Sequence, residues 1–300
     1  MRRAAIILLT LAILSGCGKV KEAEEGIENI IQEKPGTFSC IFDGVKHSFL
    51  LELPEEAENA PLVMMLPGYG NTAEAFRLQT QFEVEANAHG YAVVYVTGAP
   101  DPDSPGSSTG WNSESGTGGN RDVEFICALA RYLQDEYSLD KTSLFAVGFS
   151  NGAFMVHRLA METEGTFAAY VSVAGFMSGS VWNERRETNS AGFFQITGEK
   201  DDVVPKKSDG SAAYSKAPAI EDVMEYWAGS NGLEHFENAQ IGNGSVLTKY
   251  SSGDRPQQVW HLLVSDGRHS WPSRSYNKID TNGLIMEFLE SQTNNLSGSK

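Results

Sequence analysis

The sequence contains the pattern Gly-x-Ser-x-Gly twice, and this pattern can present a serine for nucleophilic attack. One copy is GFSNG at residues 148–152 and the other is GSSTG at residues 106–110. A serine hydroxyl attacks only when a neighbouring base takes its proton, and the flanking glycines leave room for a sharp turn that exposes the hydroxyl. The chemistry that this pattern could support is acyl transfer through a covalent serine intermediate.

Local context separates the two serines. Ser150 follows the apolar run 144–149 and precedes residues 152–162, whose apolar spacing suits a packed helix. Ser108 lies in a stretch of Pro, Gly, Ser and Asp that favours neither a strand before it nor a helix after it. We therefore predict that Ser150 is the nucleophile and that Ser108 belongs to a flexible loop.

A serine nucleophile requires a histidine base later in the chain. Beyond the predicted helix the candidates are His235, His261 and His269. His235 lies in a polar stretch and His261 lies inside the apolar run 258–264, so both fit surface or sheet positions. His269 comes just after that run, where the carboxyl end of a strand would deliver it to the edge at which open α/β sheets bind ligands. We predict that His269 is the base.

The acid that orients the histidine has two neighbouring candidates. Asp201 and Asp202 follow the apolar run GFFQIT and would reach the same edge of the sheet. Asp266 also ends a strand, but it stands only three residues before His269. Position alone leaves Asp201 and Asp202 in competition.

Acyl transfer also needs two backbone N–H groups that stabilise the developing oxyanion. One is predicted to come from Asn151, directly after the nucleophile, and the other from Tyr69, in the Gly-flanked turn of PLVMMLPGYGN. A turn with a purely structural role is the alternative for the second donor.

These residues need a scaffold of alternating strands and helices. Short apolar runs, which predict buried strands, are PLVMML, YAVVYV, SLFAVGF, AAYVSVAG, GFFQIT and QVWHLLV, and TFSCIFD and KHSFLLEL predict a strand pair around Gly44. Helices are predicted near residues 73–88, 122–137, 152–162, 220–228 and 283–291. The pattern indicates one α/β domain over residues 37–291 with a mainly parallel central sheet covered by helices on both faces, followed by a disordered tail at 292–300.

The N-terminus predicts export and a lipid anchor. Two arginines, an apolar run and LSGC resemble the signal of bacterial lipoproteins, with residues 1–16 as the signal peptide and Cys17 as the lipidated residue. Residues 17–36 are predicted to tether the domain to the membrane, so the protein would lie on the outer face as a secreted lipoprotein. The membrane is expected as a partner through this anchor alone, and which membrane holds it is left open.

Composition excludes several classes of function. A net charge of −16 argues against nucleic acid as a partner. The sequence lacks CxxC and HExxH, so no metal site is predicted. Cys40 and Cys127 could pair outside the cytoplasm, although their apolar surroundings slightly favour two buried thiols.

Six segments in this order, LPGYGNTAEAF, GWNS, RDVEFI, GFSNGAFMVHRLA, GEKDDVVP and RHSWP, resemble the secreted esterases that include poly(3-hydroxybutyrate) depolymerases and feruloyl and acetyl xylan esterases. The resemblance spans roughly residues 37–290 and implies an α/β hydrolase without a cofactor. It implies Ser150, Asp201 and His269 as the catalytic residues, because the Gly-x-x-Asp spacing from Gly198 selects Asp201 over Asp202.

Two departures from the family pattern affect the site. Family members commonly carry His-Gly where this chain has Pro67-Gly68, which leaves the support of the oxyanion turn open. The acid motif of the family is usually Gly-Thr-x-Asp, and Glu199 replaces the threonine here.

The expected activity is serine esterase action on feruloyl or acetyl esters of plant polysaccharide. Trp111, Asn112 and Trp271 lie in predicted loops near the site and are expected to contact substrate. A depolymerase acting on polyester, a peptidase of the same fold and a non-catalytic binding lipoprotein are the alternatives. The acyl group, the alcohol part of the substrate and the oligomeric state are left open by the sequence.

Overall fold

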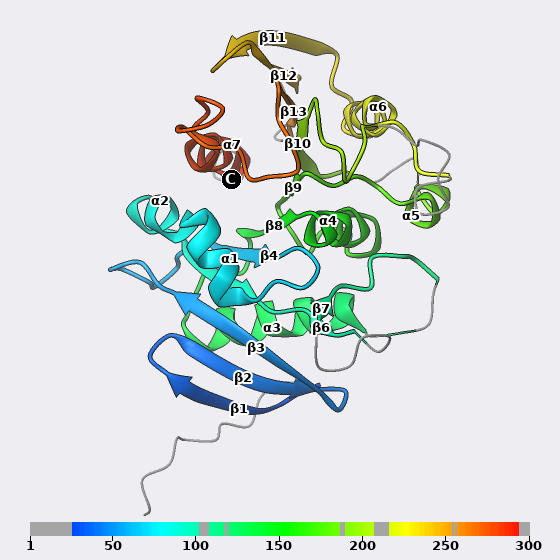
Figure 1. The fold of residues 1–300 in the computed structure, drawn as a ribbon. Coiled ribbons are helices and arrows are strands. Elements are labelled where there is room, and N and C mark those ends of the chain that lie inside the picture. Colours follow the sequence, from blue (N-terminus) through cyan, green and yellow to red (C-terminus); the bar gives the residue numbers. More distant parts are fainter. Residues whose placement is uncertain are drawn as a thin grey trace, which may run out of the picture.

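An eleven-stranded sheet runs through the protein, with helices packed on both of its faces (Figure 1). The computed structural model describes residues 26–101, 108–116, 119, 121–186, 190–206, 216–253, 255 and 257–293. The strand order is β1-β2-β3-β5-β4-β8-β9-β10-β13-β12-β11.

The centre of the sheet is parallel, as predicted. Each neighbouring pair from β5 to β13 runs parallel in the strand order. The central strands are β4 (Leu62–Leu66), β5 (Ala92–Val96), β8 (Leu144–Phe149), β9 (Ala169–Val173), β10 (Gly192–Gly198) and β13 (Val259–Val264). All residues of the first five are buried, which explains why these strands read as continuous apolar runs.

Antiparallel strands extend the sheet on both sides. On one side lie β1 (Ile27–Lys34), β2 (Thr37–Phe42) and β3 (Val45–Glu52), and the β2–β3 pair is the hairpin predicted around Gly44. On the other side lie β12 (Ser245–Ser251) and β11 (His235–Ile241), which the sequence did not reveal. A separate short pair, β6 (Ala99–Pro100) and β7 (Thr109–Gly110), lies beside the turn after β4, where the backbone N–H of Gly70 donates to the carbonyl of Thr109 at 2.7 Å.

Strand β1 corrects the predicted tether. Residues 27–34 were assigned to a spacer that ended at residue 36, but they pair with β2 as an edge strand. Ile27 and Ile30 are buried, but most residues of the strand are exposed and several are charged. The sequence therefore lacks the apolar run by which the other strands were predicted. The folded domain therefore begins before residue 37. Residues 1–25, including Cys17, lie outside the described residues.

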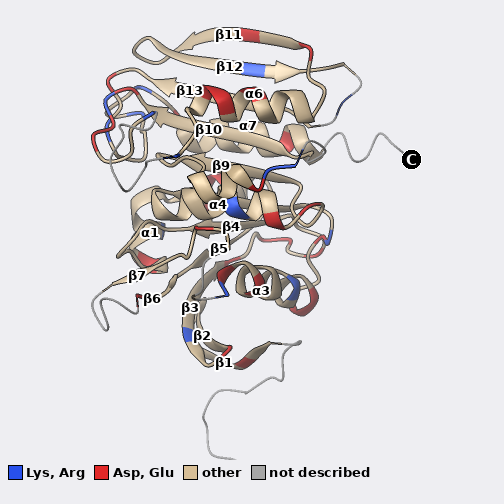
Figure 2. Ribbon diagram, turned by 90° about the vertical axis from the view of Figure 1, so that its right-hand side faces the viewer, with Lys and Arg blue, Asp and Glu red and all other residues tan. Residues whose placement is uncertain are grey.

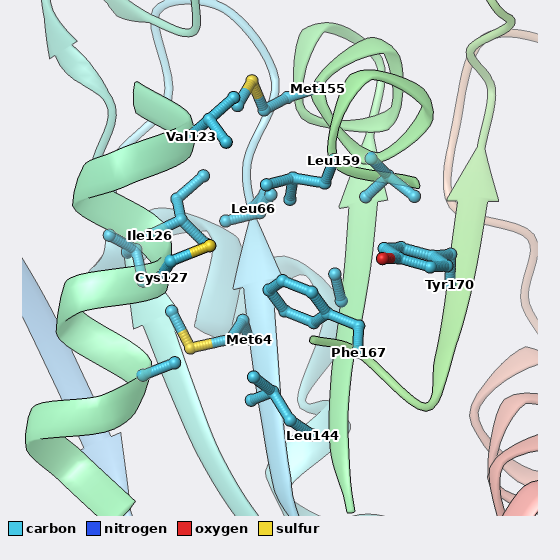
Figure 3. Packing of buried hydrophobic residues seen from close by; sticks show 14 of the residues in the cluster. Met64, Leu66, Val123, Ile126, Cys127, Leu144, Met155, Leu159, Phe167 and Tyr170 are labelled. Carbon is cyan, nitrogen blue, oxygen red and sulfur yellow. The ribbon is translucent and has the colours of Figure 1, made fainter. Parts of the chain in front are cut away.

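The helices form two layers over two hydrophobic cores. Helices α3 (Asp122–Glu136), α4 (Asn151–Glu162), α5 (Gly179–Asn183) and α6 (Ile220–Ser230) cover one face. Helices α1 (Ala73–Thr80), α2 (Phe82–Ala88) and α7 (Thr281–Thr293) cover the other. Figure 3 shows side chains of α3 and α4 packing onto β4, β8 and β9. Figure 2 shows that charged residues occur mainly on the helices, the outer strands and the loops.

Two helix predictions need adjustment. The helix predicted over residues 73–88 is split at Gln81, whose φ of 47° ends α1 and begins α2. The predicted tail at 292–300 begins too early, because α7 continues to Thr293, and residues 294–300 lie outside the described part.

Both cysteines of the described domain are buried and unpaired. Burial raises the pKa of Cys40 and brings that of Cys127 to about 11, so both are inert thiols near neutral pH. The described residues contain no cluster of His, Cys, Asp and Glu suited to a metal ion. None of the described helices is both long enough and apolar enough to cross a membrane.

Candidate active site

Ser150 occupies a sharp turn between strand β8 and helix α4. Its φ of 53° and ψ of −118° place a non-glycine residue in a region that side chains rarely adopt. The backbone N–H of Ser150 donates to the carbonyl of Val173 on the neighbouring strand β9 at 3.0 Å. The strained turn is thus held by the sheet and has the form of a nucleophile elbow.

The two glycines of GFSNG are needed because the backbone is crowded on both sides of the turn. A Cβ atom at Gly148 would collide with the carbonyl of Gly152, and a Cβ atom at Gly152 would collide with the carbonyl of Leu66. Only glycine fits at either place, which gives the sequence pattern a steric reason.

The turn brings Ser150 to His269. Nε2 of His269 lies 2.9 Å from Oγ of Ser150, and Nδ1 lies 2.9 Å from Oδ2 of Asp201. The side chain of Asp201 is 1% exposed and that of His269 is 17% exposed. Three residues from three separate loops therefore form one hydrogen-bonded chain that ends at the serine hydroxyl.

The structure distinguishes Asp201 from Asp202. The second carboxylate oxygen of Asp201 accepts the backbone N–H groups of Val203 at 2.9 Å and Val204 at 2.8 Å. Asp202 is exposed at the surface. The fixed carboxylate beside His269 is thus that of Asp201, the residue selected by the Gly-x-x-Asp spacing.

The loops of the acid and the histidine are joined directly. The backbone N–H of Lys200 donates to the carbonyl of Gly267 at 2.8 Å, and a Cβ atom at Gly198 would lie 2.6 Å from that carbonyl. Glu199, which replaces the threonine usual in the family, accepts the backbone N–H of Asp266 at 3.3 Å. The substituted residue therefore contributes a contact between the two loops.

The turn after β4 passes beside Ser150. A Cβ atom at Gly68 would lie 3.2 Å from Cβ of Ser150. Tyr69 follows in this turn, and its hydroxyl donates to Asp101 at 2.5 Å. The N–H of Asn151 is the first of helix α4, where N–H groups have no acceptor within the helix. Asn151 thus directly follows Ser150 in the chain, and Tyr69 follows the glycine that packs against Ser150.

Trp111 connects the two sides of this region. Its indole N–H donates to the carbonyl of Pro67 at 3.0 Å, and its backbone N–H donates to Oδ1 of Asn151 at 2.7 Å. The amide of Asn151 returns a bond to the carbonyl of Trp111 at 3.1 Å. Trp111 is only 5% exposed, so its position suits support of the turn better than the substrate contact expected from the sequence.

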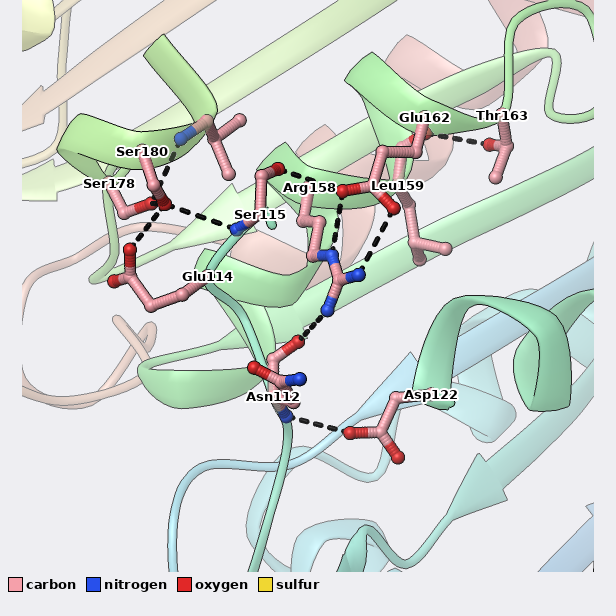
Figure 4. Close-up of polar contacts among 11 residues, drawn as sticks. Asn112, Glu114, Ser115, Asp122, Arg158, Leu159, Glu162, Thr163, Ser178 and Ser180 are labelled. Atoms are coloured by element: carbon pink, nitrogen blue, oxygen red, sulfur yellow. Dashed lines mark hydrogen bonds and ion pairs between the residues drawn. The ribbon is translucent and has the colours of Figure 1, made fainter. Parts of the chain in front are cut away.

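A polar cluster holds the residue that follows Trp111 (Figure 4). The backbone N–H of Asn112 donates to Asp122 at 2.7 Å, and its carbonyl accepts from Arg158 at 2.6 Å. Arg158 also donates to both carboxylate oxygens of Glu162, at 2.8 and 3.2 Å. Glu162 in turn accepts from Ser115 at 2.8 Å. Helices α3 and α4 thus fix the backbone of the segment that carries Trp111.

The sequence alone did not predict the polar cluster around Asn112. The spacing of Arg158 and Glu162 predicts a helical ion pair, but nothing in the sequence relates it to Asn112. Asp122 is 1% exposed, and burial raises its pKa to about 6, opposed by the N–H of Asn112 and the charge of Arg158.

The rejected candidates lie elsewhere. The carbonyl of Ser108 accepts from the backbone N–H of Asp101, and strand β7, not a helix, directly follows Ser108. His235 is on exposed strand β11 and His261 is within β13. His157, in helix α4 itself, is buried against Gln195 at 3.2 Å, and burial lowers its pKa to about 3.

Trp271 is partly exposed two residues after His269. Its ring packs edge-on against Phe76, with the ring centroids 5.8 Å apart, and its indole N–H donates to Asn282 at 3.1 Å. The substrate contacts predicted for Trp271 and Asn112 stay predictions.

Comparison with known proteins finds esterases among the relatives of this chain. Residues 47–224 match the family described as esterase PHB depolymerase. Feruloyl esterase C of Emericella nidulans is 28% identical over 204 residues, which cover 66% of this chain and 64% of that protein. Acetylxylan esterase A of the same organism is 27% identical over 161 residues, which cover 50% of each chain. The matches therefore span between half and two thirds of these relatives.

Solved structures share the fold. An acetyl xylan esterase from Aspergillus awamori superposes with a TM-score of 0.54 at 15% identity, covering 79% of this chain and 94% of that one. Esterase PE8 gives a TM-score of 0.53 at 16% identity, covering 80% of this chain and 96% of that one. With a family match over more than half of its length, the chain belongs to the esterase PHB depolymerase family and has the α/β-hydrolase fold.

Proposed function

We propose that the protein is a serine esterase that cleaves carboxylic esters through an acyl-enzyme on Ser150. The observation that carries this proposal is the hydrogen-bonded chain from Ser150 through His269 to Asp201, built on a strained elbow. A non-catalytic binding protein would have no need for a buried carboxylate, an oriented imidazole and a strained serine in one line.

In the first half of the reaction, Ser150 attacks the ester carbonyl. With a proton on Nδ1 held by Asp201, Nε2 of His269 accepts the serine proton as the bond to carbon forms. The N–H groups of Asn151 and Tyr69 stabilise the oxyanion, a contribution of about 3 to 4 kcal/mol for each donor. His269 then gives the proton to the departing alcohol, which leaves the acyl group on Ser150.

In the second half, water takes the place of the alcohol. His269 removes a proton from the water as it attacks the acyl carbonyl, and returns the proton to Oγ of Ser150 when the acid leaves. These residues and the water supply every proton transfer of the two halves.

The substrates proposed are acetyl or feruloyl esters of plant polysaccharide. Support comes from relatives named acetylxylan esterase and feruloyl esterase. Cleavage of a polyester is the second candidate, and it is favoured by the description of the matching family.

We also propose that the enzyme works outside the cell, on a lipid anchor at Cys17. The support is the N-terminal sequence, in which an apolar run follows two arginines and ends in LSGC. Strand β1 begins at Ile27, which leaves residues 18–26 as the longest possible spacer between this anchor and the sheet. The catalytic domain would therefore lie close to the membrane surface.

A panel of substrates tests the proposed activity. The purified protein is assayed with acetylated xylan, feruloylated arabinoxylan, a 3-hydroxybutyrate oligomer and a peptide, with the Ser150→Ala variant as the blank. We expect hydrolysis of one or both polysaccharide esters at a rate well above that of the other two substrates. Turnover of the peptide alone would contradict esterase function, and preference for the oligomer would select the second candidate.

A further inference from the structure

A cleft of about 380 Å³ opens beside the loop that carries the catalytic histidine. Three segments line it: residues 79–85 at the junction of α1 and α2, residues 271–274 after the histidine, and residues 279–282 at the start of α7. Its volume falls within the range of small-molecule sites, which is about 300 to 1,000 Å³.

The cleft lies close to the hydrogen-bonded residues Ser150, His269 and Asp201. Trp271, which lines it, has its ring centroid 6.5 Å from that of Phe149. Phe149 directly precedes Ser150, and its ring centroid lies 5.2 Å from that of His269. The single ring of Phe149 thus separates Trp271, in the wall of the cleft, from the imidazole of His269.

The walls are fixed by hydrogen bonds before anything binds. The indole N–H of Trp271 donates to Oδ1 of Asn282 at 3.1 Å, and the amide of Asn282 donates to the carbonyl of Thr80 at 2.9 Å. These bonds join all three segments. Between them Gln81 holds a left-handed backbone with φ of 47°, a strained conformation of the kind that gathers at binding sites.

The lining of the cleft combines many hydrogen-bonding groups with one large aromatic surface. Nine of its thirteen residues are polar or charged, and the largest apolar surface among the others is that of Trp271. Sugars present hydroxyl groups, which both donate and accept hydrogen bonds, around faces of C–H groups that pack on aromatic rings. The exposed amide of Gln81 can donate and accept at once, which suits hydroxyl groups. The amide oxygen of Gln79 accepts from Asn71 at 3.3 Å, and its N–H groups can donate to a ligand.

We propose that this cleft binds a neutral sugar residue of the polysaccharide on the alcohol side of the scissile ester. The inference rests on the proposed esterase function and adds the place where the chain beyond the ester is held. Along its length a polyester offers only hydrogen-bond acceptors, which would leave the acceptors of the cleft without a donor from the ligand. An anionic sugar would meet Glu85 and Asp280, and Arg274 is already paired with Asp280.

A pair of tryptophan variants tests the cleft. Val84 lines the cleft and is 67% exposed, so Val84→Trp fills the cleft from a surface position. Leu78, which is 69% exposed on the preceding helix and is not part of the lining, supplies the matched control Leu78→Trp. Two substrates carry the same acyl group, the one turned over best in the panel: a neutral xylo-oligosaccharide ester and a 4-nitrophenyl ester.

The readout is the ratio of kcat/KM for the oligosaccharide ester to kcat/KM for the small ester. Val84→Trp should lower this ratio about tenfold through a higher KM, the loss expected when one or two hydrogen bonds are removed. Leu78→Trp should keep the ratio within about twofold of the parent. Gln79→Ala should lower the ratio in the same direction without filling the cleft.

The outcomes separate this inference from the proposed function. An unchanged ratio in both Val84→Trp and Gln79→Ala, with the parent active on esters, would overturn the sugar site and leave the esterase standing. A larger loss on a 3-hydroxybutyrate oligomer than on the oligosaccharide would assign the cleft to polyester and overturn the proposal. Failure of the parent on every ester would remove the proposed function itself.

Discussion

Asn151 and Trp111 exchange two hydrogen bonds, in which the side-chain amide of Asn151 imitates the edge of a strand. Oδ1 accepts the backbone N–H of Trp111 at 2.7 Å, and Nδ2 donates to its carbonyl at 3.1 Å. Trp111 also binds the carbonyl of Pro67, so one residue ties the start of helix α4 to the turn that carries Tyr69. Asn151 thus shapes the proposed oxyanion region with its side chain as well as its backbone.

The first prediction removes this amide. Asn151→Ala keeps the backbone N–H but frees Trp111, so kcat should fall by about tenfold, less than the 10² to 10³ that loss of a whole oxyanion donor costs. KM should change little, because ground-state binding is not altered. Steady-state kinetics on a soluble ester measure both, and Asn238→Ala on the exposed strand β11 serves as control. An unchanged kcat would show that Trp111 needs no help from Asn151.

The second prediction concerns the two adjacent carboxylates. Asp201→Asn should lower kcat by about 10⁴, because an amide favours the wrong tautomer of His269. Asp202→Asn should cost less than about tenfold, since this side chain is exposed and Asp201 alone contacts the imidazole. Both variants should keep the circular dichroism of the parent. The reverse ranking would transfer the acid role to Asp202.

The third prediction follows from the buried Asp122. Burial raises its pKa from 3.8 to about 6, so the folded state holds this proton more tightly than the unfolded state does. The contribution of Asp122 to the free energy of unfolding is therefore largest below pH 4 and falls as the pH rises from about 4 to 6.

Asp122→Asn removes this titration while keeping an acceptor for Asn112. Relative to the parent, the variant should gain about 2 kcal/mol of unfolding free energy between pH 4 and pH 7, as measured by urea denaturation at both values. Asp43→Asn, at an exposed surface position, is the control. A difference between variant and parent that stays constant across this range would contradict the shifted pKa.

The fourth prediction tests the anchor. Cys17→Ser should abolish covalent attachment of fatty acid, because the variant lacks the thiol to which the lipid is joined. The protein should therefore move from the membrane fraction to the soluble fraction. Metabolic labelling with a radioactive fatty acid detects the modification. A variant that still carries the label would show that Cys17 is not the lipidated residue.

How much of the fold could be predicted depended on where each strand lies in the sheet. The central strands are buried on both faces, so runs such as Leu144–Phe149 stand out in the sequence. The outermost strands β1 and β11 bury few of their residues, and their polar composition resembles that of loops. This is why the tether was extended over residues 27–34, although they form part of the sheet.

The sequence likewise predicted some residues of the candidate site and not others. Ser150, Asp201 and His269 each follow a recognisable strand, and the parallel order of these strands brings their carboxyl ends together. The support provided by Trp111, Arg158 and Asp122 depends on contacts between segments far apart in the chain. Such contacts leave no spacing in a single sequence, so the tryptophan was expected to face substrate rather than the backbone beneath it.

The central claim is that Ser150 forms the acyl-enzyme, and covalent labelling tests it most directly. The protein is incubated with a fluorophosphonate, which phosphonylates an activated serine, and the modified peptide is identified by mass spectrometry. We predict one adduct, on Ser150, that is lost in Ser150→Ala and retained in Ser108→Ala. An adduct on Ser108, or no adduct on Ser150 in a folded protein that hydrolyses esters, would contradict the account.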